Sequence, residues 1–179
     1  MFLLALPCRA GATPHAWAFW SGDGCVEWIG PRHTNFGDGS ICAFGAQDQI
    51  WTDGGDPTAL LDLYSVWAVR HLHLEIFGRW PGRQYTLTSP DPRAQAYYRR
   101  IECLDAELCA CGSTTTYAKC CKARDLQVDF VEGAKAFLKG SPGGFASRQP
   151  PPAIVRFAME PTAPPRIRDL LHLARQEGV

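Results

Sequence analysis

The chain has 179 residues, 46% of them hydrophobic, and its 18 basic and 18 acidic residues cancel to a formal net charge of zero. That length suits one compact domain with an appendage, or two small domains. A neutral chain has no global basic field, so the composition argues against nucleic acid or an anionic membrane surface as a partner.

No apolar run approaches the length of a membrane span, and the apolar start from Met1 to Cys8 is too short for a signal segment. We therefore expect a cytoplasmic protein. Its eight cysteines are then expected to be reduced, so that clustered cysteines indicate a metal site and isolated ones indicate packing or catalysis.

The first elements in chain order are two segments rich in aromatic and β-favouring residues, at 15–20 and 25–29. The glycine-containing turn at 21–24 separates them, which predicts a β-hairpin. A polar, glycine-rich loop follows and ends at Cys42. A thiol where a loop returns to regular structure can serve as a nucleophile, or it can be a small buried hydrophobic side chain.

The rest of the chain is mainly helical in pattern. Apolar residues recur at three or four residues from 58 to 77, and Pro57 and Gly78 suit the first turn and the C-cap. This helix is apolar over so much of its surface that we expect it to be the spine of the domain. Further predicted elements are helices at 93–108, 125–138 and 166–176, and a short strand at 153–158 within the proline-rich stretch 140–165.

The loop residues His33, Asn35, Gly39, Ile41 and Cys42 resemble the active-site loop of ubiquitin-conjugating enzymes. That family's pattern is His-Pro-Asn, a short variable run, then Gly-x-Ile-Cys. Here Thr34 replaces the proline, and the run is one residue shorter. The continuation, with Trp51 and the stretch 60–82, resembles the bacterial branch found in antiphage defence islands.

The resemblance implies that Cys42 accepts, from an activating enzyme, the C-terminal acyl group of a ubiquitin-like modifier or of a target protein. An amine would then attack the thioester while the Asn35 amide stabilises the oxyanion. His33 would organise the loop, or alternatively act as a base for Cys42. Only 32 residues precede His33, so the resemblance implies either a reduced form of the family's fold or a start further upstream.

A second group holds four cysteines in thirteen residues, namely Cys109, Cys111, Cys120 and Cys121. Two short pairs separated by a loop can place four sulfurs around one tetrahedral Zn²⁺. The basic residues Lys119, Lys122 and Arg124 are near enough in sequence to offset the charge of four thiolates. The alternative is a set of structural cysteines without a metal, and Cys103 is near enough to compete as a ligand.

Together with Gly112, Ser113, Tyr117 and Lys119, these cysteines resemble the SEC-C motif, Cys-x-Cys-Gly-Ser followed by Lys-Cys-Cys. This resemblance implies a structural zinc and a module that contacts a protein partner. Four protein ligands leave no open position for catalysis at the metal.

We therefore predict an α+β protein with three parts. Residues 1–90 would form a small ubiquitin-conjugating-like domain, 91–125 a helix with the zinc module, and 126–179 a helix, a Pro/Gly-rich segment and a closing helix. The first functional hypothesis is a conjugation enzyme acting through Cys42. The second is a non-catalytic zinc-binding adaptor with a degenerate conjugating-enzyme fold.

Two further expectations concern isolated residues. Cys8, Cys25 and Cys103 lie outside both motifs and are interpreted as packing residues. His71 and His73 sit two residues apart on the long helix, so they should point to different faces and share no metal.

Overall fold

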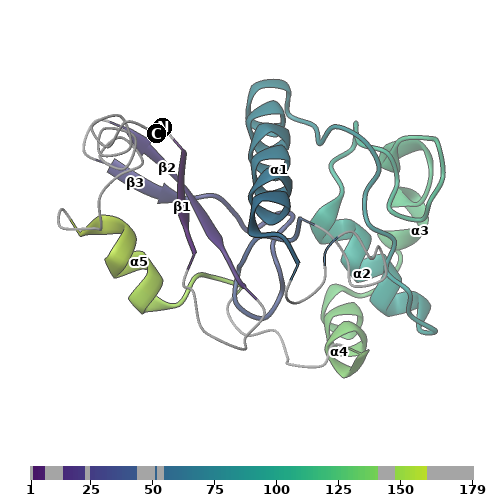
Figure 1. Cartoon of the computed structure of the whole chain (residues 1–179). Coiled ribbons are helices and arrows are strands. Elements are labelled where there is room, and N and C mark those ends of the chain that lie inside the picture. Colours follow the sequence, from purple (N-terminus) through teal and green to yellow (C-terminus); the bar gives the residue numbers. More distant parts are fainter. Residues whose placement is uncertain are drawn as a thin grey trace, which may run out of the picture.

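The computed structural model describes residues 2–6, 14–22, 25–43, 51, 55–140 and 148–160. It confirms an α+β architecture, with one three-stranded antiparallel sheet and helices around it (Figure 1). Among the described residues, no helix combines the length and apolarity needed to cross a membrane.

The sheet has the order β1-β2-β3 and confirms the predicted hairpin. Strand β2 spans Trp17–Gly22 and pairs with β3, Cys25–Trp28, so that Phe19 faces Trp28 across the ladder. The edge strand β1, Phe2–Ala5, was not predicted. Its four residues are uniformly apolar, and period-2 alternation, the signal for a half-buried strand, is missing there.

In β2 and the residue before it, alternate side chains are buried on opposite faces of the sheet. Ala16 and Ala18 pack with Trp67 of α1, Pro57–Phe77, on one face. Trp17 and Phe19 pack with Ala158 of α5, Pro152–Met159, on the other. The two helices therefore cover the two sides of the sheet, as the ribbon shows (Figure 1).

Helix α1 begins and ends as predicted. The Asp56 side chain accepts a hydrogen bond from the Thr58 amide, and Gly78 closes the helix in the left-handed conformation at a φ of 64°. As expected for the spine of the domain, the helix packs against the sheet, but it buries only one face. Apolar residues on its other side are exposed, and these are Leu61, Val66, Val69, Leu72, Ile76 and Phe77.

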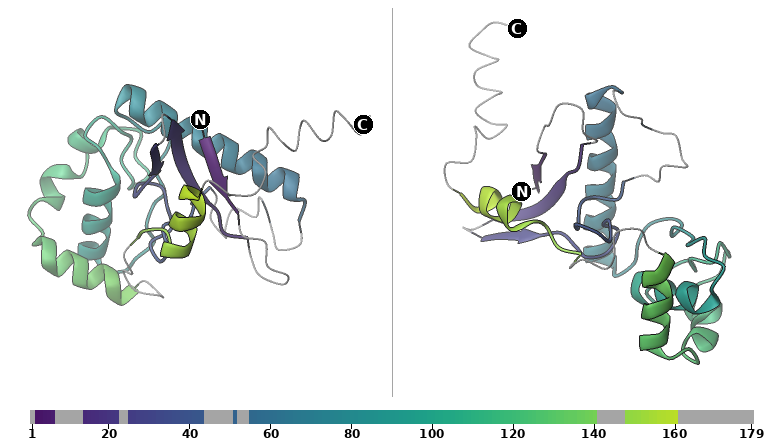
Figure 2. Two further views of the ribbon diagram at one scale, coloured as in Figure 1. Left: turned by 90° about the vertical axis from the view of Figure 1, so that its left-hand side faces the viewer. Right: turned by 90° about the horizontal axis from the view of Figure 1, so that it is seen from below.

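A second group of helices, here called the helical unit, lies beside the sheet at one end of α1 (Figure 2). It runs from residue 92 to residue 140, and its elements are α2 at Pro92–Glu102, the 3₁₀ turn η2 at Tyr117–Lys119, α3 at Lys122–Asp125 and α4 at Phe130–Gly140. Its core combines buried side chains of α2 and α4, including Tyr97 and Phe137, with Cys109 and Tyr117.

Three predicted elements need correction. The helix expected at 93–108 stops at Glu102, because Cys103 is extended and residues 103–121 turn back on themselves. The helix expected at 125–138 is displaced to α4. The strand expected at 153–158 is helix α5, which Pro152 can open because proline fits the first helical turn. The helix expected at 166–176 lies outside the described residues.

Candidate functional site

The four predicted ligand cysteines meet in one cluster. The sulfurs of Cys109, Cys111, Cys120 and Cys121 all lie within 4.8 Å of one another. The Sγ atoms of Cys111 and Cys120 are 3.5 Å apart, and those of Cys120 and Cys121 are 3.7 Å apart. Four sulfurs at about 2.3 Å from a tetrahedral metal would be separated by about 3.8 Å. The cluster can therefore hold one metal ion.

The backbone of residues 103–121, here called the cysteine knuckle, sets this arrangement. Leu108 and Thr116 form an antiparallel bridge, and the Cys109 amide donates to the Thr115 carbonyl at 3.0 Å. Gly112 has a φ of 89°, a conformation in which glycine has no Cβ to clash. These contacts bring the second cysteine pair, which follows η2, back onto the first.

Burial and neighbouring polar groups shift the pKa values of the clustered cysteines. Burial raises the pKa of Cys109 and of Cys121, whereas the hydrogen bond with Cys111 lowers the pKa of Cys120 to about 7. Arg124 donates through Nη2 to the sulfur of Cys121 at 3.2 Å, as expected for a cation that offsets thiolate charge. Lys122 instead pairs with Asp105 at 2.6 Å.

A buried ion pair braces the far side of the knuckle. Arg99 of α2 donates through Nε and Nη2 to the Asp125 carboxylate at 2.7 and 2.6 Å, and their side chains are only 6% and 1% exposed. Because Asp125 ends the short helix that follows Cys121, this pair fixes the second cysteine pair to α2.

The cysteines outside the cluster differ in burial. Cys103 is buried outside the metal cluster, which confirms its packing role, and burial raises its pKa to about 11. Cys25 is exposed, so its interpretation as a packing residue was wrong. Cys8 lies outside the described residues.

Cys42 is exposed at the end of residues 30–42, here called the Cys42 loop. Its amide donates to the His33 carbonyl at 3.2 Å, and Thr34 and Ile41 form a bridge just inside that contact. The same loop contacts the helical unit, because the ring centroids of Phe36 and of Phe137 on α4 are 5.0 Å apart.

Asn35 lies inside the same loop. Its Nδ2 donates to Ser40 Oγ at 2.9 Å and to the Ile41 carbonyl at 3.3 Å. The amide therefore contacts the residue that immediately precedes Cys42. Asp38 completes the loop by accepting from the hydroxyl and amide of Ser40.

His33 favours the loop-organising interpretation over that of a base. Its ring stacks on Trp80 at a centroid distance of 3.5 Å, and burial together with Arg32 lowers its pKa to about 2. Its carbonyl accepts from Trp67 Nε1 at 2.7 Å as well as from the Cys42 amide. His71 and His73 have different partners, in line with the expectation that they point to different faces of the helix. His71 donates to the Arg32 carbonyl, and His73 donates to the Arg79 carbonyl.

The buried histidines predict a specific pH dependence of stability. Burial lowers the pKa of His71 to about 4 and that of His33 to about 2, whereas both titrate near 6.5 when unfolded. Below pH 6.5 the unfolded chain binds protons that the folded chain does not, so each histidine should cost about 1.4 kcal/mol per pH unit. Urea unfolding at pH 7, 6 and 5, with zinc content followed, measures this slope. His71→Gln should make it shallower, and parallel curves would contradict the assignment.

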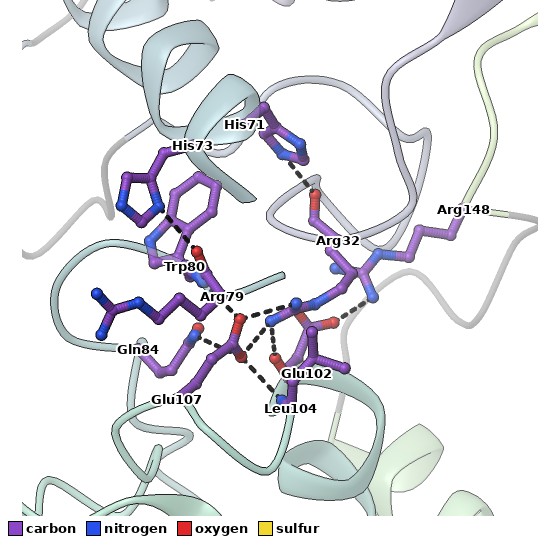
Figure 3. A network of polar contacts seen from close by, with 10 residues as sticks. All are labelled: Arg32, His71, His73, Arg79, Trp80, Gln84, Glu102, Leu104, Glu107 and Arg148. Carbon is purple, nitrogen blue, oxygen red and sulfur yellow. Dashed lines mark hydrogen bonds and ion pairs between the residues drawn. The ribbon is translucent and has the colours of Figure 1, made fainter. Parts of the chain in front are cut away.

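Sequence reasoning missed a network of buried charges between the loop and the knuckle (Figure 3). Glu107 is 1% exposed and accepts from both terminal nitrogens of Arg32, at 2.9 and 2.6 Å. Arg148 pairs with Glu102 and donates to the Thr34 carbonyl at 3.0 Å. No motif marks these four charged residues, and the contacts named here join residues that are 46 to 114 positions apart.

The other acidic residues near Cys42 in sequence have structural contacts or are not described. Asp38 holds the loop and pairs with His15 at 2.8 Å, and Asp56 caps α1. Asp48 and Asp53 lie outside the described residues.

No protein-family model matches this chain, and no curated protein or solved structure matches it. The resemblances to ubiquitin-conjugating enzymes and to the SEC-C motif therefore rest on their motif residues.

Proposed function

We propose that this chain is a zinc-binding protein in which Cys109, Cys111, Cys120 and Cys121 hold one structural Zn²⁺. The observation that carries the proposal is the convergence of four sulfurs within 4.8 Å of one another. Four thiolates suit zinc, and a site closed by four protein ligands is structural. The similarity to the SEC-C motif supports the same ligand set.

The metal would hold together a surface for a protein partner. Three large apolar side chains lie exposed just after the knuckle, and these are Leu126, Phe130 and Val131, at 56%, 46% and 57% exposure. Leu126 follows α3, whereas Phe130 and Val131 begin α4, and contiguous exposed apolar residues can mark an interaction site. The function proposed for the helical unit is thus zinc-dependent docking of a protein.

Elemental analysis of protein purified without added metal tests the zinc assignment. We expect about one zinc per chain, lost when Cys120 and Cys121 are both changed to serine. Cys25→Ser, which removes an exposed thiol outside the cluster, should retain the metal. Protein without zinc, or zinc undiminished in the double variant, would defeat the assignment.

A second candidate function is conjugation through Cys42. It is favoured by an exposed thiol whose preceding residue contacts the Asn35 amide. The Cys42 thiolate would attack a thioester carried by an activating enzyme, and the enzyme's thiol would leave. An amine would then attack the new thioester and release Cys42, while Asn35 exchanges its contacts with Ser40 and Ile41 for the oxyanion.

A reductant-sensitive gel shift with a modifier and activating enzyme from neighbouring genes tests this candidate. Wild type should form the adduct, and Cys42→Ser should give a stable oxyester or none, because a hydroxyl is a poorer nucleophile near neutral pH. Asn35→Ala should load but transfer about 10²-fold more slowly. The matched control Cys25→Ser should behave as wild type. Equal behaviour of wild type and Cys42→Ser would leave the adaptor function in its place.

A further inference from the structure

Glu107 is a buried carboxylate at which three parts of the chain meet (Figure 3). Arg32 reaches it from the Cys42 loop, at 2.9 and 2.6 Å. The Trp80 amide at 2.7 Å and Gln84 Nε2 at 3.0 Å reach it from the segment after α1. The Leu104 amide at 2.8 Å reaches it from the knuckle. A buried charge with this many donors is held in one position, because losing any donor leaves it underpaired.

The backbone of Glu107 belongs to the cysteine knuckle. Its carbonyl accepts from the Tyr117 amide at 2.8 Å, next to the bridge between Leu108 and Thr116. Cys109 follows two residues later. Whatever ties the two cysteine pairs together therefore also fixes the turn from which the Glu107 side chain projects.

On the side of the Cys42 loop, Arg32 is connected to Cys42 through one residue. The next residue, His33, offers the carbonyl that accepts the Cys42 amide at 3.2 Å. A second buried link runs in parallel, from Glu102 at the end of α2 through Arg148 to the Thr34 carbonyl. The ring of Phe36 also packs against Phe137 of the helical unit at 5.0 Å. The loop is thus anchored to the helical unit rather than to the sheet alone.

We propose that Glu107 is a positioning residue that couples metal binding at the four cysteines to the conformation of the Cys42 loop. This inference rests on the proposed zinc site. When the metal leaves, the two cysteine pairs separate, and the segment that carries Glu107 is released. Arg32 then loses its buried partner, and the backbone contacts of the Cys42 loop open.

Hydrogen exchange of the full-length protein measures the coupling from the metal to the loop. Chelation should speed exchange at the amides of Asn35, Ile41 and Cys42 about tenfold, within the range usual for coupled sites. Glu107→Gln should do the same with zinc bound. Asp105 also lies in the knuckle, and Asp105→Asn breaks its exposed pair with Lys122. This variant should leave hydrogen exchange in the Cys42 loop unchanged. Strands β1 and β2 report whether each protein is folded, and if Glu107→Gln is not, wild type with and without chelator decides.

Coupling must be reciprocal, so a change in the loop should weaken zinc binding by the same factor. The hydrogen bonds from Arg32 to Glu107 involve none of the four ligand cysteines, yet Arg32→Gln should raise the zinc dissociation constant about tenfold in competition with a chromogenic chelator. Arg79→Gln, an exposed arginine drawn beside the network in Figure 3, is the matched control and should not. Wild type that binds zinc but shows equal loop exchange with and without it, or equal affinity in Arg32→Gln, overturns the coupling. Protein that binds no zinc overturns the zinc site itself.

Discussion

Removing zinc should unfold the cysteine knuckle and destabilise the whole helical unit. Between residues 103 and 125 the only helices are one turn each, η2 and α3, and a segment with so little regular structure cannot pay its ordering entropy from burial alone. In small zinc modules the metal contributes about 10–16 kcal/mol of apparent free energy, which is also folding energy. We expect chelation to lower the helical circular dichroism signal and the melting temperature, and zinc to restore both.

The protein in which Cys120 and Cys121 are serine provides the control for this experiment. It should already show the lowered melting temperature, and the chelator should change it no further. Superimposable melting curves of wild-type protein with and without chelator would contradict a folding role for the metal.

Breaking the ion pair between Arg99 and Asp125 should cause the largest loss of stability of any single substitution considered. Asp125→Asn removes the charge but keeps the side chain's shape, which leaves the Arg99 guanidinium buried without a counter-ion. Such uncompensated charges cost about 3–5 kcal/mol. Urea unfolding with zinc present measures the free energy of unfolding.

Glu132→Gln is the matched control, since it removes a carboxylate from an exposed pair with Lys135 on α4. Exposed pairs of this kind contribute about 0–1 kcal/mol. If the two substitutions changed the unfolding free energy equally, the buried pair would not be the brace that we describe.

The sequence predicted those elements that are determined by residues close to one another in the chain. The alternation and glycine turn of the hairpin, and the residues Pro57 and Gly78 at the two ends of α1, act within a few residues. The segment at 153–158 misled because a short run of apolar β-branched residues fits a strand or a helix equally well. In the structure Ala158 packs against Ala5, Trp17 and Phe19 of the sheet, a contact between residues far apart in sequence that local patterns do not reveal.

The same division holds for the candidate sites. The cysteine spacing predicted the metal cluster because all four ligands lie within one short segment. The proximity of Asn35 and His33 to Cys42 could also be predicted, because all three residues lie in one short loop. The buried charges at Arg32, Glu102, Glu107 and Arg148 could not be predicted, because each is paired with a residue far away in sequence and polar residues of these types are usually solvated.

The link between Thr34 and Arg148 has a consequence for the order in which the protein can fold during synthesis. The two residues are 114 positions apart, so the loop near the N-terminus cannot complete its contacts until almost the whole described chain has left the ribosome. Helix α5, which covers Trp17 and Phe19, emerges later still. Until then one apolar side of the sheet stays uncovered, a condition that favours aggregation. The side of the sheet that holds Trp17 and Phe19 is therefore expected to need chaperone protection until α5 has been synthesised.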